Sequence, residues 1–329
     1  MTSFFERNKK GLVWLTLVLL ALTLAACCVA CGEQGEVTES ETDLPVIQPE
    51  ENGIRGLSDM AMIRTGVIDS DYAILCELGE LRAVAGARAT EKMYPASLTK
   101  LMTFIVAYEN APDHTALIEI TKQLKNQYAE GSRIGIDVGD LLTVEQMMYA
   151  LLLESDTDAA LGLACHVAGG ESAFVDLMNA KAREMGLENT HFANVTGLHA
   201  KDHYTTAAEM AEILAYALDI PLGKTIMTTD RYVTYLKYYK NGVLTEYRMT
   251  FKNTTLVGRF ADNHVATETD DGTVVLGGKT GYTDEGRYCL ATVAKTADGR
   301  EYILITGHAS SGENSARDAL KLYGLYAGD

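Results

Sequence analysis

The sequence predicts an α+β fold in which an antiparallel sheet is flanked by helices and interrupted by an inserted, mostly helical region. Short apolar runs separated by turns predict two or three strands between residues 54 and 86. Strand patterns return in the C-terminal third, over 232–249, 274–276, 287–295 and 302–306. Because strands come from both ends of the chain and helical periodicity lies between them, we expect one sheet built from both ends.

The helices are predicted from the spacing of apolar residues and from signals at their ends. A helix over 97–108 has its apolar residues on one face and follows Pro95. Thr143 and Gln146 have the spacing of a capping box, which opens a helix that runs to about residue 152. Further helices are predicted over 158–167, 172–185, 206–218 and 316–326.

The N-terminal residues 1–26 are predicted to be a secretory signal with a lipobox. Arg7, Lys9 and Lys10 precede an uncharged run, which is the order of a signal peptide. The segment 24–27, Leu-Ala-Ala-Cys, is similar to a bacterial lipobox, in which Cys27 would be lipidated and become the mature N-terminus. An uncleaved membrane anchor remains the alternative, because about 20 apolar residues can span a bilayer. Both interpretations place the rest of the chain outside the cytoplasm.

Residues 27–54 are predicted to be an acidic tether, because seven acidic residues and no Lys or Arg lie between 32 and 54. The formal net charge of the whole chain is −17. Such a surface repels nucleic-acid phosphate, so non-specific DNA or RNA binding is excluded as a function.

The first motif with chemical meaning is Ser97-Leu98-Thr99-Lys100. Residues three apart share one face of a helix, so the Ser97 hydroxyl and the Lys100 amine can meet. A serine hydroxyl needs a base to act as a nucleophile, and lysine becomes a base when burial lowers its pKa. At the start of a helix, backbone N–H groups also point to where an oxyanion would form. The alternative is a solvated surface pair.

Two further motifs follow in the chain. Ser155-Asp156-Thr157 falls in the break between two predicted helices, where a hydroxyl could relay a proton and where such residues also serve as helix caps. Lys279-Thr280-Gly281 follows an apolar run, and a lysine with a hydroxyl on a strand edge can bind a carboxylate. Gly281 would let a ligand backbone approach closely. The alternative for this motif is an ordinary strand end.

Together, the three motifs occur in the order typical of β-lactamases and penicillin-binding proteins. The chain resembles the serine-type D-Ala-D-Ala carboxypeptidases, which are the low-molecular-mass penicillin-binding proteins. The resemblance runs from about residue 55 to the C-terminus. It is carried by 94–103 (YPASLTKLMT), 190–198 (THFANVTGL), 203–207 (HYTTA), 251–254 (FKNT) and 279–289 (KTGYTDEGRYC).

The resemblance implies a β-lactamase/transpeptidase-like fold for a catalytic domain over 55–329, and a role for each matching residue. Ser97 would attack the carbonyl between two terminal D-alanines, and Lys100 would take its proton. Ser155 would help to pass a proton to the departing D-alanine. Water would then release the acyl-enzyme.

The remaining implied roles concern substrate binding. Lys279 and Thr280 would hold the terminal carboxylate of the substrate, and the N–H groups of Ser97 and Tyr282 would form the oxyanion hole. The implied partners are peptidoglycan stem peptides as substrates, β-lactams as slowly released covalent inhibitors, and the membrane through the N-terminal lipid. No cofactor or metal is implied, and no His-x-x-Glu-His spacing of a zinc peptidase is present.

Two departures from the family pattern stand out. The middle motif usually ends in asparagine, whereas this chain has Thr157, which is shorter and offers one hydroxyl. Many relatives also have an arginine near the last strand. Arg317 is the nearest candidate, but its surroundings fit poorly, and it stays outside the predicted site.

Two alternative functions remain open from the sequence. A class A-like β-lactamase is one, although no Glu-x-x-Leu-Asn segment lies between Thr157 and Lys279. The other is a non-catalytic cell-wall sensor of the same fold. The unusual Thr157 in the middle motif is the reason to consider it.

Overall fold

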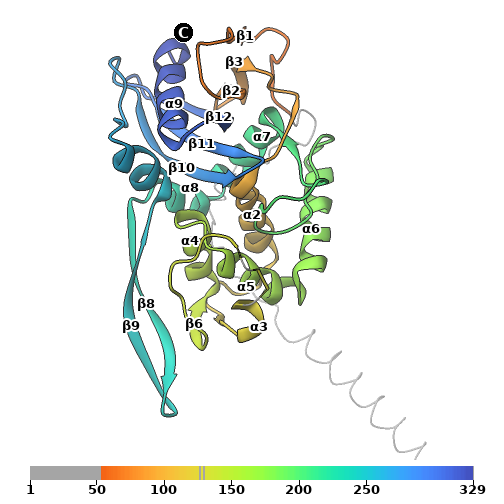
Figure 1. The fold of residues 1–329 in the computed structure, drawn as a ribbon, viewed down its shortest axis with the longest axis vertical. Coiled ribbons are helices and arrows are strands. Elements are labelled where there is room, and N and C mark those ends of the chain that lie inside the picture. Colours follow the sequence, from red (N-terminus) through yellow and green to blue (C-terminus); the bar gives the residue numbers. More distant parts are fainter. Residues whose placement is uncertain (1–52, 126, 129, 329) are drawn as a thin grey trace, which may run out of the picture. The chain divides into compact units, whose positions relative to one another are not determined.

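The computed structural model describes residues 53–125, 127–128 and 130–328 (Figure 1). The predicted signal over 1–26, Cys27 and almost all of the predicted tether lie outside the described residues, and they stay predictions. Among the described residues, no helix combines the length and the hydropathy that crossing a bilayer requires.

The main sheet has six strands in the order β1-β3-β2-β12-β11-β10. The strands are β1 (Ala61–Met62), β2 (Tyr72–Glu77), β3 (Arg82–Ala87), β10 (Val274–Thr283), β11 (Arg287–Lys295) and β12 (Glu301–Ala309). The N-terminal and C-terminal strands meet at β2 and β12, where Ile74 lies opposite Ile305. This pairing confirms the prediction of one sheet from both ends of the chain. All pairs are antiparallel except β1 with β3, which is parallel.

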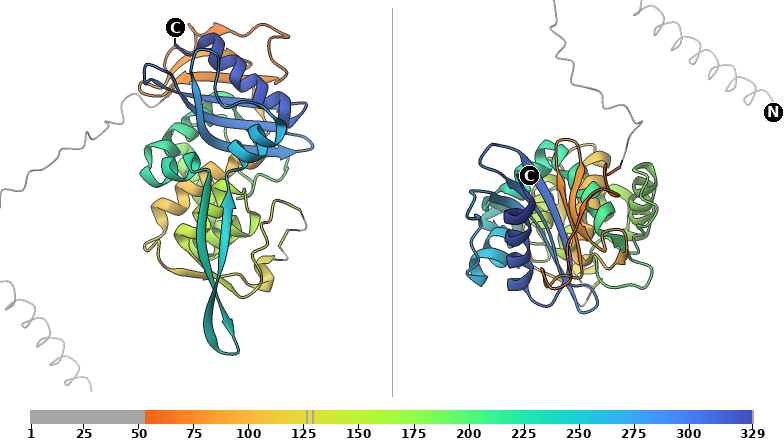
Figure 2. Two further views of the ribbon diagram at one scale, coloured as in Figure 1. Left: turned by 90° about the vertical axis from the view of Figure 1, so that its left-hand side faces the viewer. Right: turned by 90° about the horizontal axis from the view of Figure 1, so that it is seen from above.

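Helices cover both faces of this sheet (Figures 1 and 2). The helix α9 (Gly312–Tyr326) packs on one face with Leu75 and Leu304, and α7 (Ala207–Asp219) and α8 (Pro221–Thr228) lie on the other. Ile74 and Ile305 point to that second face. Because both faces of the sheet are buried at β12, the sequence of this strand is a continuous apolar run rather than an alternation of apolar and polar residues.

The helical region supports the site from below the sheet. Its helices are α2 (Lys100–Asn110), preceded by the 3₁₀ turn η1 (Ala96–Thr99), α4 (Val144–Leu153), α5 (Thr157–Ala168) and α6 (Glu171–Glu184), with a short α3 (Lys122–Lys125). The predicted capping box at Thr143 and Gln146 is confirmed, because each contributes a side-chain bond to the other's backbone. The predicted helices therefore begin and end within a few residues of the observed ones.

Smaller elements complete the domain. A second sheet has the order β5-β6-β8-β9, from β5 (Leu117–Glu119), β6 (Asp140–Thr143), β8 (Arg231–Lys240) and β9 (Val243–Lys252). The β8–β9 hairpin extends from the main sheet along the helical region (Figure 1). β4 (Lys92–Met93) pairs with β7 (Thr205–Thr206), and the π-helix η2 (Thr254–Phe260) and the 3₁₀ turn η3 (Ala261–Asn263) precede β10.

The prediction for β10 was too short, since the strand continues from Leu276 to Thr283. The added residues are mostly glycine and polar, so they lack the apolar pattern of a strand. The glycines are required by close packing. A side chain at Gly277 would collide with the Met227 carbonyl of α8, and one at Gly278 with the Ala291 carbonyl of β11.

Candidate active site

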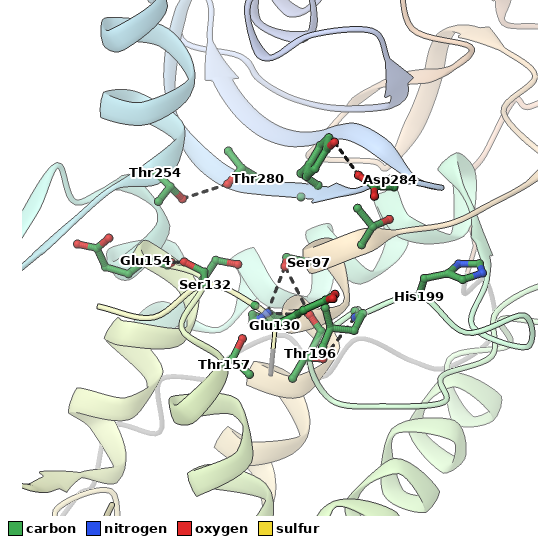
Figure 3. A pocket seen from close by; sticks show the side chains of 18 of the residues that line it. Ser97, Glu130, Ser132, Glu154, Thr157, Thr196, His199, Thr254, Thr280 and Asp284 are labelled. Atoms are coloured by element: carbon green, nitrogen blue, oxygen red, sulfur yellow. Dashed lines mark hydrogen bonds between the residues drawn. The ribbon is translucent and has the colours of Figure 1, made fainter. Parts of the chain in front are cut away.

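A cavity of about 750 Å³ opens where η1, the α4–α5 break, the 194–198 loop and β10 meet (Figure 3). Seven of the predicted site residues line it: Ser97, Lys100, Ser155, Thr157, Thr280, Gly281 and Tyr282. Lys279 does not line it, and Cys27 lies outside the described residues. The structure thus brings together motifs that are up to 185 residues apart (Ser97 to Tyr282).

Ser97 lies in the second position of a tightly braced turn. Ala96, just before it, has a left-handed backbone with φ 49°, a conformation that costs an L-residue about 1–2 kcal/mol. The Thr99 hydroxyl donates to the Ala96 carbonyl at 2.8 Å, and Thr99 also bonds the ring of His203 at 2.7 Å. Burial lowers the pKa of His203 to about 3, so the ring is neutral. These contacts hold the strained turn that presents Ser97.

Lys100 is buried and lies next to the Ser97 hydroxyl. Its Nζ is 3.2 Å from Ser97 Oγ and donates to the Thr196 carbonyl at 2.7 Å. Burial lowers the pKa of Lys100 to about 7, while the charge of Asp156 acts in the opposite direction. About half of the Lys100 amines are therefore neutral near pH 7. The carbonyl partner is fixed by Asn194, whose Oδ1 accepts from the backbone of Thr196 and Gly197.

Ser155 occupies the break between α4 and α5 with φ 59°, again left-handed. Its hydroxyl is buried and has no hydrogen-bond partner among the described residues. Buried hydroxyls are nearly always paired, so an unpaired one in the wall of a cavity indicates a ligand contact. Asp156 beside it caps α5 by accepting from Ala159 N at 2.8 Å, which fixes the break. Burial raises the pKa of Asp156 to about 6.

Thr157 faces the cavity across the 130–133 loop (Figure 3). Its backbone N–H donates to Ser132 O at 2.9 Å, and its side chain fills the space in which Gly131 would carry a Cβ. Gly131 has φ 114°, a conformation that favours glycine. The loop is therefore fitted to a side chain of the size of threonine.

Thr157→Asn is expected to lower kcat/KM for the reaction proposed below by about fivefold rather than raise it. The reason is that Thr157 Oγ1 lies against Gly131, so an amide extending in the same direction would overfill this contact, which costs about 1 kcal/mol or more. Steady-state kinetics of D-alanine release checks this. A tenfold gain would show instead that threonine impairs the site.

The strand β10 passes directly beside the nucleophile. A Cβ on Gly281 would lie 3.0 Å from Ser97 N and 3.1 Å from Pro95 O, so only glycine lets the strand approach this closely. Thr280 points into the cavity and bonds Thr254 Oγ1 at 3.1 Å.

Lys279 belongs to β10 but is not among the residues that line the cavity. It is fully buried, and its Nζ donates to Thr280 O at 2.7 Å. Burial holds its pKa well below the usual range, and the charges of Lys100 and Arg259 act in the same direction. The predicted contact of Lys279 with a substrate carboxylate stays a prediction.

Arg259 is a site residue that the sequence prediction missed. It lies on η2, is 7% exposed and lines the cavity near Thr254 and Thr280. Its Nη1 donates to Ser315 Oγ at 2.6 Å, and no described carboxylate lies within 4.0 Å of it. Burial lowers its pKa to about 10, at which it is still a cation at neutral pH. A buried guanidinium without a counter-ion is costly, which points to an anionic ligand.

The capping of η2 explains why this arginine reaches the cavity. Asn253 follows β9 and accepts from Thr255 N and Leu256 N. Its amide donates to Met227 O and Thr229 O. These four bonds fix the entry of η2. Arg317, by contrast, is exposed on α9 and paired with Glu313 at 2.8 Å. Arg317, which the sequence analysis left outside the predicted site, is not among the residues that line the cavity.

Metal ligands are not gathered in the described part of the chain, where no group of three or more His, Cys, Asp or Glu side chains has a suitable arrangement. His191, His199 and His203 are close in sequence but have different partners. His191 bonds Asp202 O, His199 faces Glu285, and His203 bonds Thr99.

Four similarities to known proteins bear on this site. The family model Peptidase_S11, described as D-alanyl-D-alanine carboxypeptidase, matches residues 60–310. The chain is 32% identical over 252 residues to the D-alanyl-D-alanine carboxypeptidase DacF of Bacillus subtilis (strain 168), covering 76% of this chain and 60% of that protein. It is 30% identical over 246 residues to DacA of Escherichia coli (strain K12), covering 72% and 55%.

The chain therefore spans about 60% or less of the length of these curated relatives. Among solved structures, it is similar to the Streptomyces K15 DD-transpeptidase, with a TM-score of 0.70, 26% identity and coverage of 80% of this chain and 99% of that chain. This likeness confirms the predicted transpeptidase-like fold.

Proposed function

The chain belongs to the Peptidase_S11 family of D-alanyl-D-alanine carboxypeptidases, and from this premise we propose that it removes the terminal D-alanine of peptidoglycan stem peptides through an acyl-enzyme on Ser97. The observation that carries the proposal is the Lys100 amine, buried and 3.2 Å from the Ser97 hydroxyl. A desolvated amine at this distance is a base matched to a serine nucleophile.

Acylation begins when Lys100 Nζ takes the proton of Ser97 Oγ, which attacks the carbonyl carbon between the two D-alanines. The carbonyl oxygen becomes an oxyanion that accepts from the backbone N–H groups of Ser97 and Tyr282, because Gly281 brings β10 against η1. The C–N bond then breaks, and the proton held by Lys100 passes through Ser155 Oγ to the leaving amine. The unpaired Ser155 hydroxyl supports this relay.

The second step releases the product. Water attacks the acyl carbonyl and gives its proton to Lys100, and the bond to Ser97 Oγ breaks as that oxygen regains a proton. The hydroxyls of Thr254 and Thr280 and the guanidinium of Arg259 hold the terminal carboxylate before the first step.

Arg259→Gln is expected to lower kcat/KM for a D-Ala-D-Ala peptide by about 30-fold, mostly through KM. A hydrogen bond to a charged group contributes about 1.5–3 kcal/mol, and Arg259 has no other anion to pair with in the described structure. The matched control is Arg317→Gln, which breaks an exposed pair with Glu313 and is expected to change kcat/KM less than twofold. Equal effects of the two variants would refute the role of Arg259.

The experiment that tests the function is D-alanine release from a diacetyl-L-lysyl-D-Ala-D-Ala peptide. The proposal expects release from this peptide and none from the isomer that ends in L-Ala, because the cavity fixes the carboxylate and the scissile carbonyl together. Absence of release from a folded chain would refute the carboxypeptidase and favour a non-catalytic sensor.

A β-lactamase is the alternative that the same residues could support. The described cavity holds Glu154, whose pKa burial raises, but its carboxylate accepts from Lys252 N at 2.6 Å rather than facing Ser97. We therefore expect penicillin to acylate Ser97 and to be released slowly. Rapid turnover of penicillin would favour the β-lactamase.

The place of action that fits this chemistry is the outer side of a bacterial cytoplasmic membrane, facing the cell wall. We propose that Cys27 carries the lipid that anchors the chain there. Incorporation of labelled palmitate that is lost in Cys27→Ser would support the anchor, and equal labelling of both chains would contradict it.

A further inference from the structure

A second cavity, of about 260 Å³, adjoins the active-site cavity and shares Glu285 with it. The wall between the two is built by Tyr94, which lines the second cavity, and His199, which lines the first. Their rings meet edge to face with centroids 4.6 Å apart, and His199 Nδ1 is 3.9 Å from Glu285 Oε2. Because Tyr94 is three residues before Ser97, the second cavity starts where the catalytic turn begins.

The second cavity is lined by two lysines and several aromatic side chains, together with the shared carboxylate of Glu285. Lys92 and Lys201 line it, and the Lys92 ammonium lies 3.8 Å from the centroid of the Tyr204 ring. Neither lysine has a carboxylate within 4.0 Å in the described residues. His308 also faces the cavity but is bonded to Asp71. Both lysines are exposed, and in a chain with a net charge of −17 two ammonium groups without a carboxylate partner at one hollow favour an anionic ligand.

The direction of a bound peptide follows from the proposed function. Its terminal carboxylate lies at Thr280 and Arg259, so its acyl side runs past Tyr282 toward Asp284 and Glu285. An extended peptide advances about 3.3 Å per residue. The second cavity shares Glu285 with the first, so the residues before the acyl-donating D-alanine run toward it.

The charges along this path alternate. The cation Arg259 lies at one end of the first cavity, the acidic pair Asp284 and Glu285 at the other, and the cations Lys92 and Lys201 in the second cavity. A ligand that fits this pattern has a carboxylate, then an ammonium, then a second carboxylate. A stem peptide has this order when its diamino acid keeps a free amine and the γ-linked D-glutamate before it keeps a free α-carboxylate.

We propose that the second cavity is a subsite for the α-carboxylate of the γ-D-glutamyl residue, two positions before the acyl-donating D-alanine, and that Lys92 and Lys201 bind it. The proposal rests on the proposed function, since it uses the direction of the substrate. It makes the chain selective for stem peptides that are not amidated at D-glutamate.

The experiment compares N-acetyl-γ-D-glutamyl-L-lysyl-D-Ala-D-Ala with the same peptide carrying D-isoglutamine, using the full chain. We expect kcat/KM to be about fivefold higher for the acid, because two exposed ion pairs contribute up to about 1 kcal/mol together. We also expect the preference to shrink at high salt. The double variant Lys92→Met/Lys201→Met is expected to lose the preference. Lys321→Met, an exposed lysine on α9 outside both cavities, is expected to keep it.

The outcomes separate the subsite from the function. Equal kcat/KM for acid and amide, or a preference that survives in the double variant, would overturn the subsite while D-alanine release from both peptides upheld the carboxypeptidase. No release from either peptide, or from diacetyl-L-lysyl-D-Ala-D-Ala, would overturn the function and the subsite together.

Discussion

Ser97→Ala is expected to reduce D-alanine release by about 10⁴-fold or more, the loss that follows removal of the nucleophile from a serine hydrolase. The remaining cavity still binds the peptide, so KM is expected to change little. Folding should be unaffected, because the Ser97 hydroxyl makes only a long contact of 3.5 Å with Thr196 O and one bond from Lys100. Thermal unfolding followed by circular dichroism checks that point.

A matched control for this variant is Ser58→Ala. Ser58 is exposed, lies outside both cavities and bonds only its neighbour Asp59. D-alanine release by Ser58→Ala is expected to equal that of the parent chain. Activity of Ser97→Ala within tenfold of the parent would exclude an acyl-enzyme on Ser97.

Lys100→Met is expected to lower the rate of acylation by about 10³-fold, because the base that takes the Ser97 proton is removed. Lys100→Arg tests whether the base or the positive charge of Lys100 is needed for this step. Arginine keeps the positive charge but stays protonated, so a base role predicts a comparable loss. An Arg variant within tenfold of the parent would show that Lys100 acts through its charge alone.

The pH dependence of the acylation rate tests whether Lys100 acts as a base. A base works in its deprotonated form, and burial lowers the pKa of Lys100 to about 7. The rate of acylation is therefore expected to rise tenfold per pH unit below about pH 6 and to level off above about pH 8. Stopped-flow measurement with a chromogenic β-lactam gives this profile. A rate that falls as the pH rises from 6 to 8 would contradict the assignment.

The fold could be predicted because its local signals agree with its tertiary packing. Thr143 and Gln146 form the capping box that their spacing predicts, and the apolar pattern of 302–306 marks a strand buried on both faces. The serine and lysine of the first motif meet as their three-residue spacing requires, although Ser97 lies in a 3₁₀ turn rather than inside the α-helix.

Other features could not be predicted because they depend on distant contacts. Arg259 is 162 residues from Ser97, belongs to no motif, and reaches the cavity only because Asn253 fixes the entry of the π-helix. The spacing of residues in the sequence therefore gives no sign that this arginine faces the cavity. The burial of Lys279 depends on how β10 packs, and an exposed lysine would have the same sequence motif.

The central claim is that Ser97 forms the acyl-enzyme, and the most direct test is to locate the covalent bond. The chain is mixed with benzylpenicillin, quenched in acid, digested and mapped by mass spectrometry. The account predicts one added penicilloyl group per chain, on the peptide that contains Ser97, and none on the Ser97→Ala variant. A penicilloyl group on another residue, or no adduct on a folded chain, would contradict it.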